Sequence, residues 1–288
     1  SAEVFVKEEK AEMSRARRAL RGLAHTRNAS PGMPIDRLNA HPFTCYQTIY
    51  AHNGRIQNWR ERRSELADEA AKRYMDAIAQ LDGEALDIVK TYNVRAVRRD
   101  VDLERRIAKL SETSAMEGTV VKEAIVAAYD CGYLGLLGRI TGNSNDNDPS
   151  QCMTDSKVLG PHIRNLNFSG LIGCMALVWM IGPNVYTFRY GKEAVAAKVL
   201  WSYSKETPSN GDPAVGDIQA VTVVASTEGM ITKAFQGVSD SVDFELQFVR
   251  FDEDHHYQLD PADGLIDLGV LPVSERVEDD HSSELVVA

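Results

Sequence analysis

Two short polar segments contain the residues best suited to chemistry. The first includes Arg27, just before a loop rich in proline and glycine. A guanidinium there could bind a carboxylate through two parallel hydrogen bonds. The second is His52-Asn53-Gly54, which follows a β-forming run over residues 46–51. Asn53 and the backbone amide of Gly54 could stabilise an oxyanion, because that task needs fixed donors and a backbone that can come close to the ligand.

Each segment also has a simpler interpretation. An isolated Asn-Gly pair is more often a hairpin turn than an oxyanion hole, and an arginine in a loop usually faces solvent. The combination is less ordinary, because two strand ends that each finish in polar residues beside a glycine can form the floor and the rim of one pocket. We therefore predict that Arg27, Asn53 and Gly54 contribute to one pocket.

The motifs and their order resemble those of the class II glutamine amidotransferases, whose glutaminase domain carries an N-terminal nucleophile. That family has a G-x-x-HTR-(W/Y)-A-T-x-G-x-P segment, then N-A-H-P, then H-N-G-x-I-x-N. The corresponding stretches here are 22–34, 39–42 and 52–58. Three later segments are also similar. Residues 152–159 resemble the family's T-D-(S/T)-E-V segment, and residues 173–179 and 189–191 resemble its G-x-(Y/F)-A-(L/F) strand and the following R-x-G. Residues 223–228 resemble its A-S-(E/D) strand.

The resemblance implies a fold and a set of roles. The fold would be α+β, a four-layer αββα sandwich of the N-terminal-nucleophile hydrolase type. Arg27 would bind the α-carboxylate of glutamine and Asp155 its α-ammonium group. The oxyanion hole and the remaining pocket lining would come from Asn53 with the Gly54 amide, and from Ser30 and His41. Three positions depart from the family pattern, namely Asn28 for an aromatic residue, Ser30 for threonine and Lys157 for glutamate.

The nucleophile is the largest departure from the family. There, an N-terminal cysteine attacks the amide, and its own α-amino group, with a pKa of roughly 8, takes the thiol proton. Here 24 residues precede His25 and none is cysteine. Three explanations stay open: Ser1 is the nucleophile after removal of Met, the nucleophile strand lies on a removed or separate piece, or the catalytic strand has been lost. Internal cysteines cannot substitute, because the mechanism needs an α-amine on the nucleophile's own residue.

Composition restricts the class of protein. The chain has 288 residues, 43% of them hydrophobic, as in soluble globular proteins. The net charge of −10 argues against a nucleic-acid-binding face as the main feature. The longest apolar run, 171–181, is too short to span a bilayer, and no leader sequence indicates secretion. We therefore expect a cytoplasmic protein that does not enter membranes.

Metal ions and cofactors are not expected. The four cysteines share neither C-x-x-C spacing nor a histidine pattern, so neither a zinc site nor a disulfide framework is predicted. The loop 142–150 has the aspartate and asparagine spacing of a calcium loop but lacks its closing glutamate. His255 and His256 are adjacent, so on a strand both rings cannot point at one metal.

The elements that must position these residues change character along the chain. After a short strand at 1–7 and a basic helix at 8–23, helical patterns are predicted at about 59–81, 84–92, 101–110 and 119–137. Strands are then predicted at 171–180, 185–189, 199–203, 220–225 and 244–251.

We expect an amidotransferase-like domain over 1–251, with a helical insertion at about 59–140, and an acidic C-terminal extension over 252–288 that lies on the surface or is partly disordered. The family has a much shorter interval at the insertion. The insertion could therefore dock a partner or mediate oligomerisation, or it could simply cover the edge of the sandwich.

Three functions stay open for this sequence. The first is a class II glutamine amidotransferase-like protein that binds glutamine or a related amide and releases ammonia if a nucleophile is present. No synthetase or acceptor domain is visible, so transfer of ammonia would need a partner chain. The second is a catalytically inactive family member kept as a structural or assembly protein, in a multi-subunit complex or a virus particle. The third is another amide hydrolase that uses Ser1, whose activity Ser1→Ala would abolish.

Overall fold

The computed structural model describes residue 23 and residues 41–91, 101–191, 195–203, 218–226, 244–260 and 264–273. Ser1, Arg27 and Ser30 lie outside these ranges, so the predictions for them stay predictions. The strand expected at 1–7 also lies outside, as does the helix expected at 8–23 except for its last residue.

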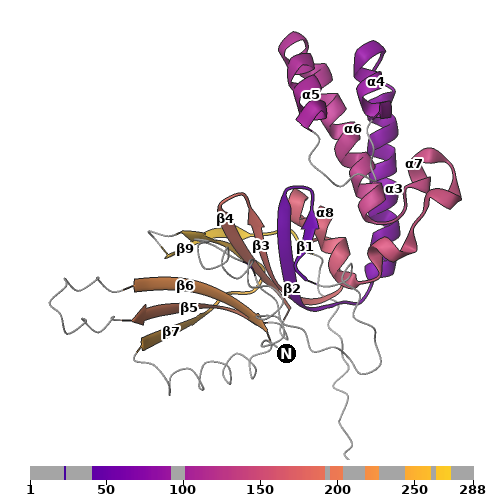
Figure 1. The fold of residues 1–288 in the computed structure, drawn as a ribbon. Helices are drawn as coiled ribbons and strands as arrows, with labels where there is room; N and C mark the ends of the chain where they lie inside the picture. Colours follow the sequence, from indigo (N-terminus) through magenta and orange to yellow (C-terminus); the bar gives the residue numbers. More distant parts are fainter. Residues whose placement is uncertain are drawn as a thin grey trace, which may run out of the picture.

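A six-stranded antiparallel sheet is the centre of the fold (Figure 1). Its strands follow the order β1-β2-β3-β4-β8-β9, and each strand is antiparallel to its neighbours. The tight turn between the third and fourth of these begins at Gly182, whose φ of +55° suits the primed turns that join twisted strands. The strands are β1 Phe43–Cys45, β2 Thr48–Ile56, β3 Gly173–Ile181, β4 Asn184–Tyr190, β8 His255–Asp260 and β9 Gly264–Val270.

A second sheet has three antiparallel strands in the order β6-β5-β7. Its strands are β5 Val195–Tyr203, β6 Ile218–Ser226 and β7 Phe244–Arg250. β6 contacts β2 and β3, while β5 contacts β3 and β4, so the two sheets pack together.

Six helices occur in the described part of the chain: α3 Trp59–Ile78, α4 Gly83–Thr91, α5 Val101–Thr113, α6 Ala115–Tyr133, α7 Gly138–Thr141 and α8 Leu159–Asn165. Figure 1 shows α3 to α6 as an arm that projects from the sheets, with α4 and α5 at its far end. We call these four helices the helical arm. At the start of α6, the Ser114 side chain accepts a hydrogen bond from the Glu117 amide, which is the usual N-cap interaction.

The helical arm has a hydrophobic core of its own. Buried apolar side chains from all four helices, and from the turn between α3 and α4, meet there: Ala77, Leu81, Ala85, Ile88, Val89, Ile107, Leu110, Val121, Ala124 and Ile125. The main core is a different cluster, in which α8 and the near ends of α3 and α6 pack on one face of the six-stranded sheet. Trp179 and Leu177 of β3 belong to this main core and are fully buried.

These observations confirm an α+β fold. All four helices predicted between 59 and 137 are present, and so are the five strands predicted between 171 and 251. In the described part of the chain, helices cover one face of the six-stranded sheet. The three-stranded sheet also packs against the six-stranded sheet. Among these residues, no helix combines the length and apolar character that a membrane crossing requires.

The prediction for the C-terminal segment is wrong over 255–270. These residues form β8 and β9 and extend the six-stranded sheet beyond β4, rather than lying on the surface as a tail. The reason is that Tyr257 is buried and stacks on Phe251, with 4.8 Å between ring centroids. An acidic segment can therefore contribute a strand when its few apolar side chains alternate towards a core.

Candidate ligand site at the edge of strand β2

The His52-Asn53-Gly54 segment lies inside β2 rather than beyond its end. β2 pairs with β3 without a break as far as Ile56, and Gly54 stands opposite Met175. The expectation that the strand finishes near residue 51 is therefore corrected. Gly54 has a φ of +134°, and a Cβ on it would lie 2.2 Å from the carbonyl oxygen of Cys174. Only glycine allows the two backbones to approach this closely.

The amide of Gly54 points away from β3. One step beyond β2 in the same register, the Gln57 N–H donates to the carbonyl of Ile172 at 2.8 Å. In an antiparallel ladder the N–H groups alternate between the two sides of the strand. Residues 52, 54 and 56 therefore direct their N–H groups towards the opposite edge of β2. β1 covers this edge only as far as the pair Phe43–Tyr50.

Asp155 lies at this same edge. Its Oδ2 accepts a hydrogen bond from the Ile56 N–H at 2.9 Å and is 3.8 Å from Nε2 of His52. The side chain is 24% exposed. Among the described residues, the hydrogen bond and the ion pair of this carboxylate both use Oδ2. The carboxylate is thus held by one oxygen and can offer the other to a cationic ligand.

The His52 ring lies beside this carboxylate, and the His41 ring packs against it. Their rings meet edge to face with 5.3 Å between centroids, and the His41 ring makes a similar contact with Phe43 at 4.7 Å. His52 is almost fully buried. His41, predicted to line the pocket, contacts the ring of His52, and His52 in turn lies beside Asp155.

Asn53 lies on the other face of the sheet from His52. Side chains alternate along a strand, and Asn53 stands opposite Ala176, which packs with Phe251 and Tyr257. The neighbouring Leu177, opposite His52, packs instead in the main core. The structure thus brings together His41, the Gly54 amide and Asp155, but it separates the Asn53 side chain from them.

The side chain of Lys157, at the position where the class II amidotransferases that the sequence resembles have glutamate, turns inwards. It is buried, and its Nζ donates a hydrogen bond to the carbonyl of Gln151. The ammonium group also lies 5.9 Å from the ring centroid of Phe43 and 5.7 Å from that of Tyr133. Cation–π attraction supports this placement. The Lys157 side chain therefore helps to hold the Asp155 segment from inside the protein and does not face the exposed edge of β2.

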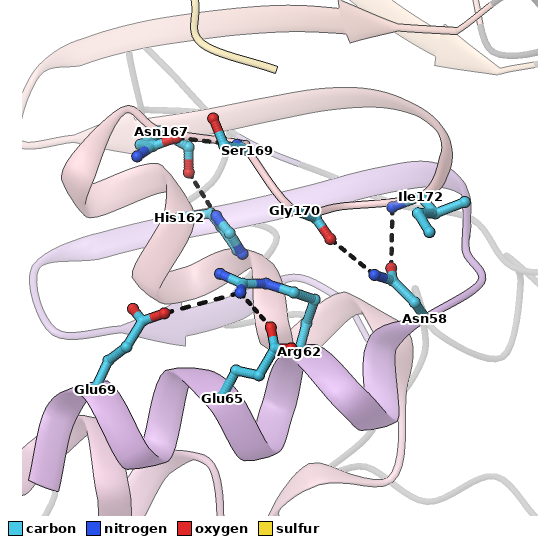
Figure 2. A network of polar contacts seen from close by, with 9 residues as sticks. All are labelled: Asn58, Arg62, Glu65, Glu69, His162, Asn167, Ser169, Gly170 and Ile172. Carbon is cyan, nitrogen blue, oxygen red and sulfur yellow. Dashed lines mark hydrogen bonds and ion pairs between the residues drawn. The ribbon is translucent and has the colours of Figure 1, made fainter. Parts of the chain in front are cut away.

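A polar network ties the start of α3 to α8 and to the segment before β3 (Figure 2). The Asn58 side chain donates to the carbonyl of Gly170 at 2.7 Å and accepts from the Ile172 N–H at 2.9 Å. Nearby, Nδ1 of His162 lies 2.5 Å from the carbonyl oxygen of Asn167. In Figure 2 the opposite side of the His162 ring faces the guanidinium of Arg62. The Asn58 contacts therefore hold the end of β2 and the start of α3 against the segment before β3.

The described residues contain no group of three His, Cys, Asp or Glu side chains arranged to hold a metal ion. The adjacent histidines of β8 make separate contacts. Nδ1 of His255 is 3.0 Å from a carboxylate oxygen of Asp267, and Nδ1 of His256 is 3.0 Å from the carbonyl of Gly269. Both rings help to hold β9 against β8.

The sequence analysis missed two tyrosines that support the Asp155 segment. The Tyr50 hydroxyl contacts the Tyr133 hydroxyl and the backbone of the short 3₁₀ helix η4, Asp155–Val158. Tyr50 and Tyr133 are 83 residues apart, so no local pattern could reveal the contact.

Chemically, the arrangement offers a partly exposed carboxylate and a backbone N–H at one strand edge. This combination suits a ligand that carries an ammonium group near a carbonyl. Comparison with models of known protein families and with curated proteins finds no match to this sequence.

Proposed function

We propose that this protein is a class II glutamine amidotransferase-like domain that binds glutamine, or a related amide, at the edge of β2. The observation that carries the proposal is the position of Asp155. Its carboxylate is fixed by the Ile56 amide beside a buried histidine, at the edge towards which the Gly54 amide also points. The resemblance of the sequence motifs supports the same assignment.

In this proposal the carboxylate binds the α-ammonium group of glutamine. The Ile56 N–H occupies Oδ2, so Oδ1 is directed to the ligand. A hydrogen bond between two charged groups is roughly twice as strong as a neutral one. Arg27 would bind the α-carboxylate at the other end of the ligand.

Release of ammonia also requires a nucleophile with a free α-amine. The nucleophile adds to the side-chain amide carbon, and the amide oxygen becomes an oxyanion that the Gly54 N–H stabilises. The α-amine takes the proton of the nucleophile and gives it to the amide nitrogen, which leaves as ammonia, and water then hydrolyses the resulting ester or thioester to glutamate. Because the Asn53 side chain lies on the opposite face of the sheet, we assign the oxyanion contact to the Gly54 amide alone. A partner chain would supply the acceptor for ammonia.

Calorimetric titration with L-glutamine tests the proposal. Asp155→Asn removes the negative charge but keeps the shape, so we expect the Kd to rise at least tenfold, which corresponds to about 1.4 kcal/mol. Asp82→Asn, on the exposed surface of the helical arm, makes the same change in net charge and should leave the Kd unchanged. Equal affinities of wild type and Asp155→Asn would contradict the proposal.

A structural or assembly role is the second candidate. The observation that favours it is the separate hydrophobic core of the helical arm, which makes the arm a folded element that projects from the sheets (Figure 1). Met116, on the arm, is 75% exposed. This candidate predicts an oligomer by light scattering that Met116→Asp weakens. A wild-type monomer at all concentrations would contradict it.

A further inference from the structure

We propose that the hydroxyl groups of Tyr50 and Tyr133 position Asp155 and thereby set the preference of the site for ligands with an α-ammonium group. The inference rests on the proposed function, because it assigns further residues to the same site. It identifies the helical arm, through α6, as part of the machinery that places the ligand-binding carboxylate.

The contacts connect α6 to η4 through β2. The Tyr50 hydroxyl is 2.7 Å from the Tyr133 hydroxyl, 3.1 Å from the carbonyl oxygen of Ser156 and 3.4 Å from that of Lys157. Ser156 directly follows Asp155. The tyrosine pair therefore fixes the backbone immediately beside the carboxylate.

Each tyrosine hydroxyl has a single proton, and this fixes which group donates in each of these hydrogen bonds. A carbonyl oxygen can only accept, so Tyr50 donates to Ser156. The contact between the two hydroxyls must then use the proton of Tyr133, which donates to Tyr50. Burial raises the pKa of both phenols well above 10, so both protons are present at neutral pH. Each tyrosine thus has one defined role.

Two further contacts hold the last turns of α6 in place. Tyr129, one turn before Tyr133, accepts a hydrogen bond from the Tyr46 amide at 2.9 Å. Asp130 is buried in an ion pair with Arg164 of α8. α6 is therefore anchored both to the turn between β1 and β2 and to the helix that follows η4, so Tyr133 is presented from a fixed support.

Asp155 is held from two sides as a result. The Ile56 N–H fixes one carboxylate oxygen, and the tyrosine pair fixes the following peptide groups. Loss of either hydroxyl should let η4 shift and move the free carboxylate oxygen away from the ligand. Only the interaction with the α-ammonium group would be weakened, because the rest of the ligand does not contact Asp155.

A pair of ligands separates positioning from general damage to the fold. L-Glutamine carries the α-ammonium group, and 4-carbamoylbutanoate is the same molecule without it. The ratio of their Kd values, measured by calorimetry on the full chain, reports the contribution of Asp155. We expect wild type to prefer glutamine by at least tenfold and Asp155→Asn to lose this preference.

Tyr50→Phe and Tyr133→Phe should each reduce the preference at least threefold, with little change in the affinity for 4-carbamoylbutanoate. Tyr133→Phe removes the donor that orients the Tyr50 hydroxyl but leaves the Tyr50 side chain unchanged, so it remains informative if Tyr50→Phe does not fold. Tyr186→Phe is the matched control, because the Tyr186 ring lies on β4 and stacks on Trp179, with 5.4 Å between ring centroids. It should keep the wild-type ratio.

The outcomes distinguish the two proposals. If wild type shows no preference, or if Asp155→Asn keeps it, the proposed function fails. If Asp155→Asn loses the preference while both tyrosine variants keep it, only the positioning role is overturned. A tyrosine variant that weakens both ligands equally also overturns positioning, because that pattern indicates general damage to the site.

Discussion

Asp130 of α6 accepts hydrogen bonds from both terminal nitrogens of Arg164 in α8, with 2.5 Å for each of the two nitrogen–oxygen pairs. The same carboxylate also accepts a hydrogen bond from Nη2 of Arg73 in α3, at 2.9 Å. The Asp130 side chain is only 1% exposed, whereas those of Arg164 and Arg73 are 19% and 36% exposed. Three helices from separate parts of the chain therefore meet at one buried carboxylate.

Asp130→Asn should destabilise the protein by about 3 kcal/mol, because it leaves the partly buried Arg164 without its counter-charge. Urea unfolding at pH 7 measures the change. Asp87→Asn is the matched control, since Asp87 pairs with Arg106 at 3.0 Å on the surface. Surface pairs contribute less than about 1 kcal/mol, so this control should change stability little. Equal effects of the two substitutions would show that burial of Asp130 does not matter.

Gly54→Ala should destabilise the protein by more than about 3 kcal/mol, because it combines strain at a φ of +134° with a clash against the Cys174 carbonyl. Gly142→Ala is the control, since Gly142 also has a positive φ, +73°, but open space around its Cα. Backbone strain alone should cost it about 1 kcal/mol. Thermal unfolding of both variants measures the difference. Equal losses would mean that the close approach of β2 and β3 is not maintained in solution.

The His162 ring makes stability depend on pH. Burial lowers the pKa of His162 to about 4, whereas an unfolded histidine titrates near 6.5. The unfolded chain therefore binds the proton first as the pH falls. The contribution to stability is complete above about pH 6.5 and decreases towards pH 4, by about 3 kcal/mol in all.

His162→Asn isolates this effect, because asparagine does not titrate and can still donate to the Asn167 carbonyl near the position of Nδ1. Urea unfolding of wild type and variant should be compared at pH 7, 5.5 and 4.5. Wild type should lose more stability over this range than the variant. Parallel losses would contradict the assignment, since the titration of all other groups is common to both proteins.

The helices of the arm could be predicted because their signals are local. α3 and α6 are long runs of helix-forming residues without an internal proline, and such runs are readable from sequence alone. β3 and β4 were equally clear, because apolar strand residues surround the Gly182 turn. Each of these elements is specified by its own residues.

The face on which a side chain lies was harder to predict. The sequence suggested that Asn53 follows the end of a strand, whereas β2 continues to Ile56 because its register with β3 is kept through Gly54. A strand that continues for a few residues places Asn53 on the opposite face from His52. The Tyr50–Tyr133 contact likewise depends on how α6 packs on β2, which no local pattern records.

Lys157 tests how far the family pattern applies to this chain. The resemblance places glutamate at this position, so a family-based design would choose Lys157→Glu. The structure predicts that this substitution destabilises the protein. The buried Lys157 ammonium donates to the Gln151 carbonyl and lies over two aromatic rings, and a carboxylate can do neither. It would also bring a second negative charge close to Asp155.

We expect Lys157→Glu to destabilise the protein by about 3 kcal/mol or more, because a buried carboxylate would have no donor in place. Lys157→Met keeps the apolar stem and removes the donor to the Gln151 carbonyl without adding a negative charge, so it should cost about 1–2 kcal/mol. Urea unfolding at pH 7 measures both variants. A Lys157→Glu protein as stable as wild type would show that this side chain faces solvent. It would also show that the inward contact with Gln151 does not hold η4 in place.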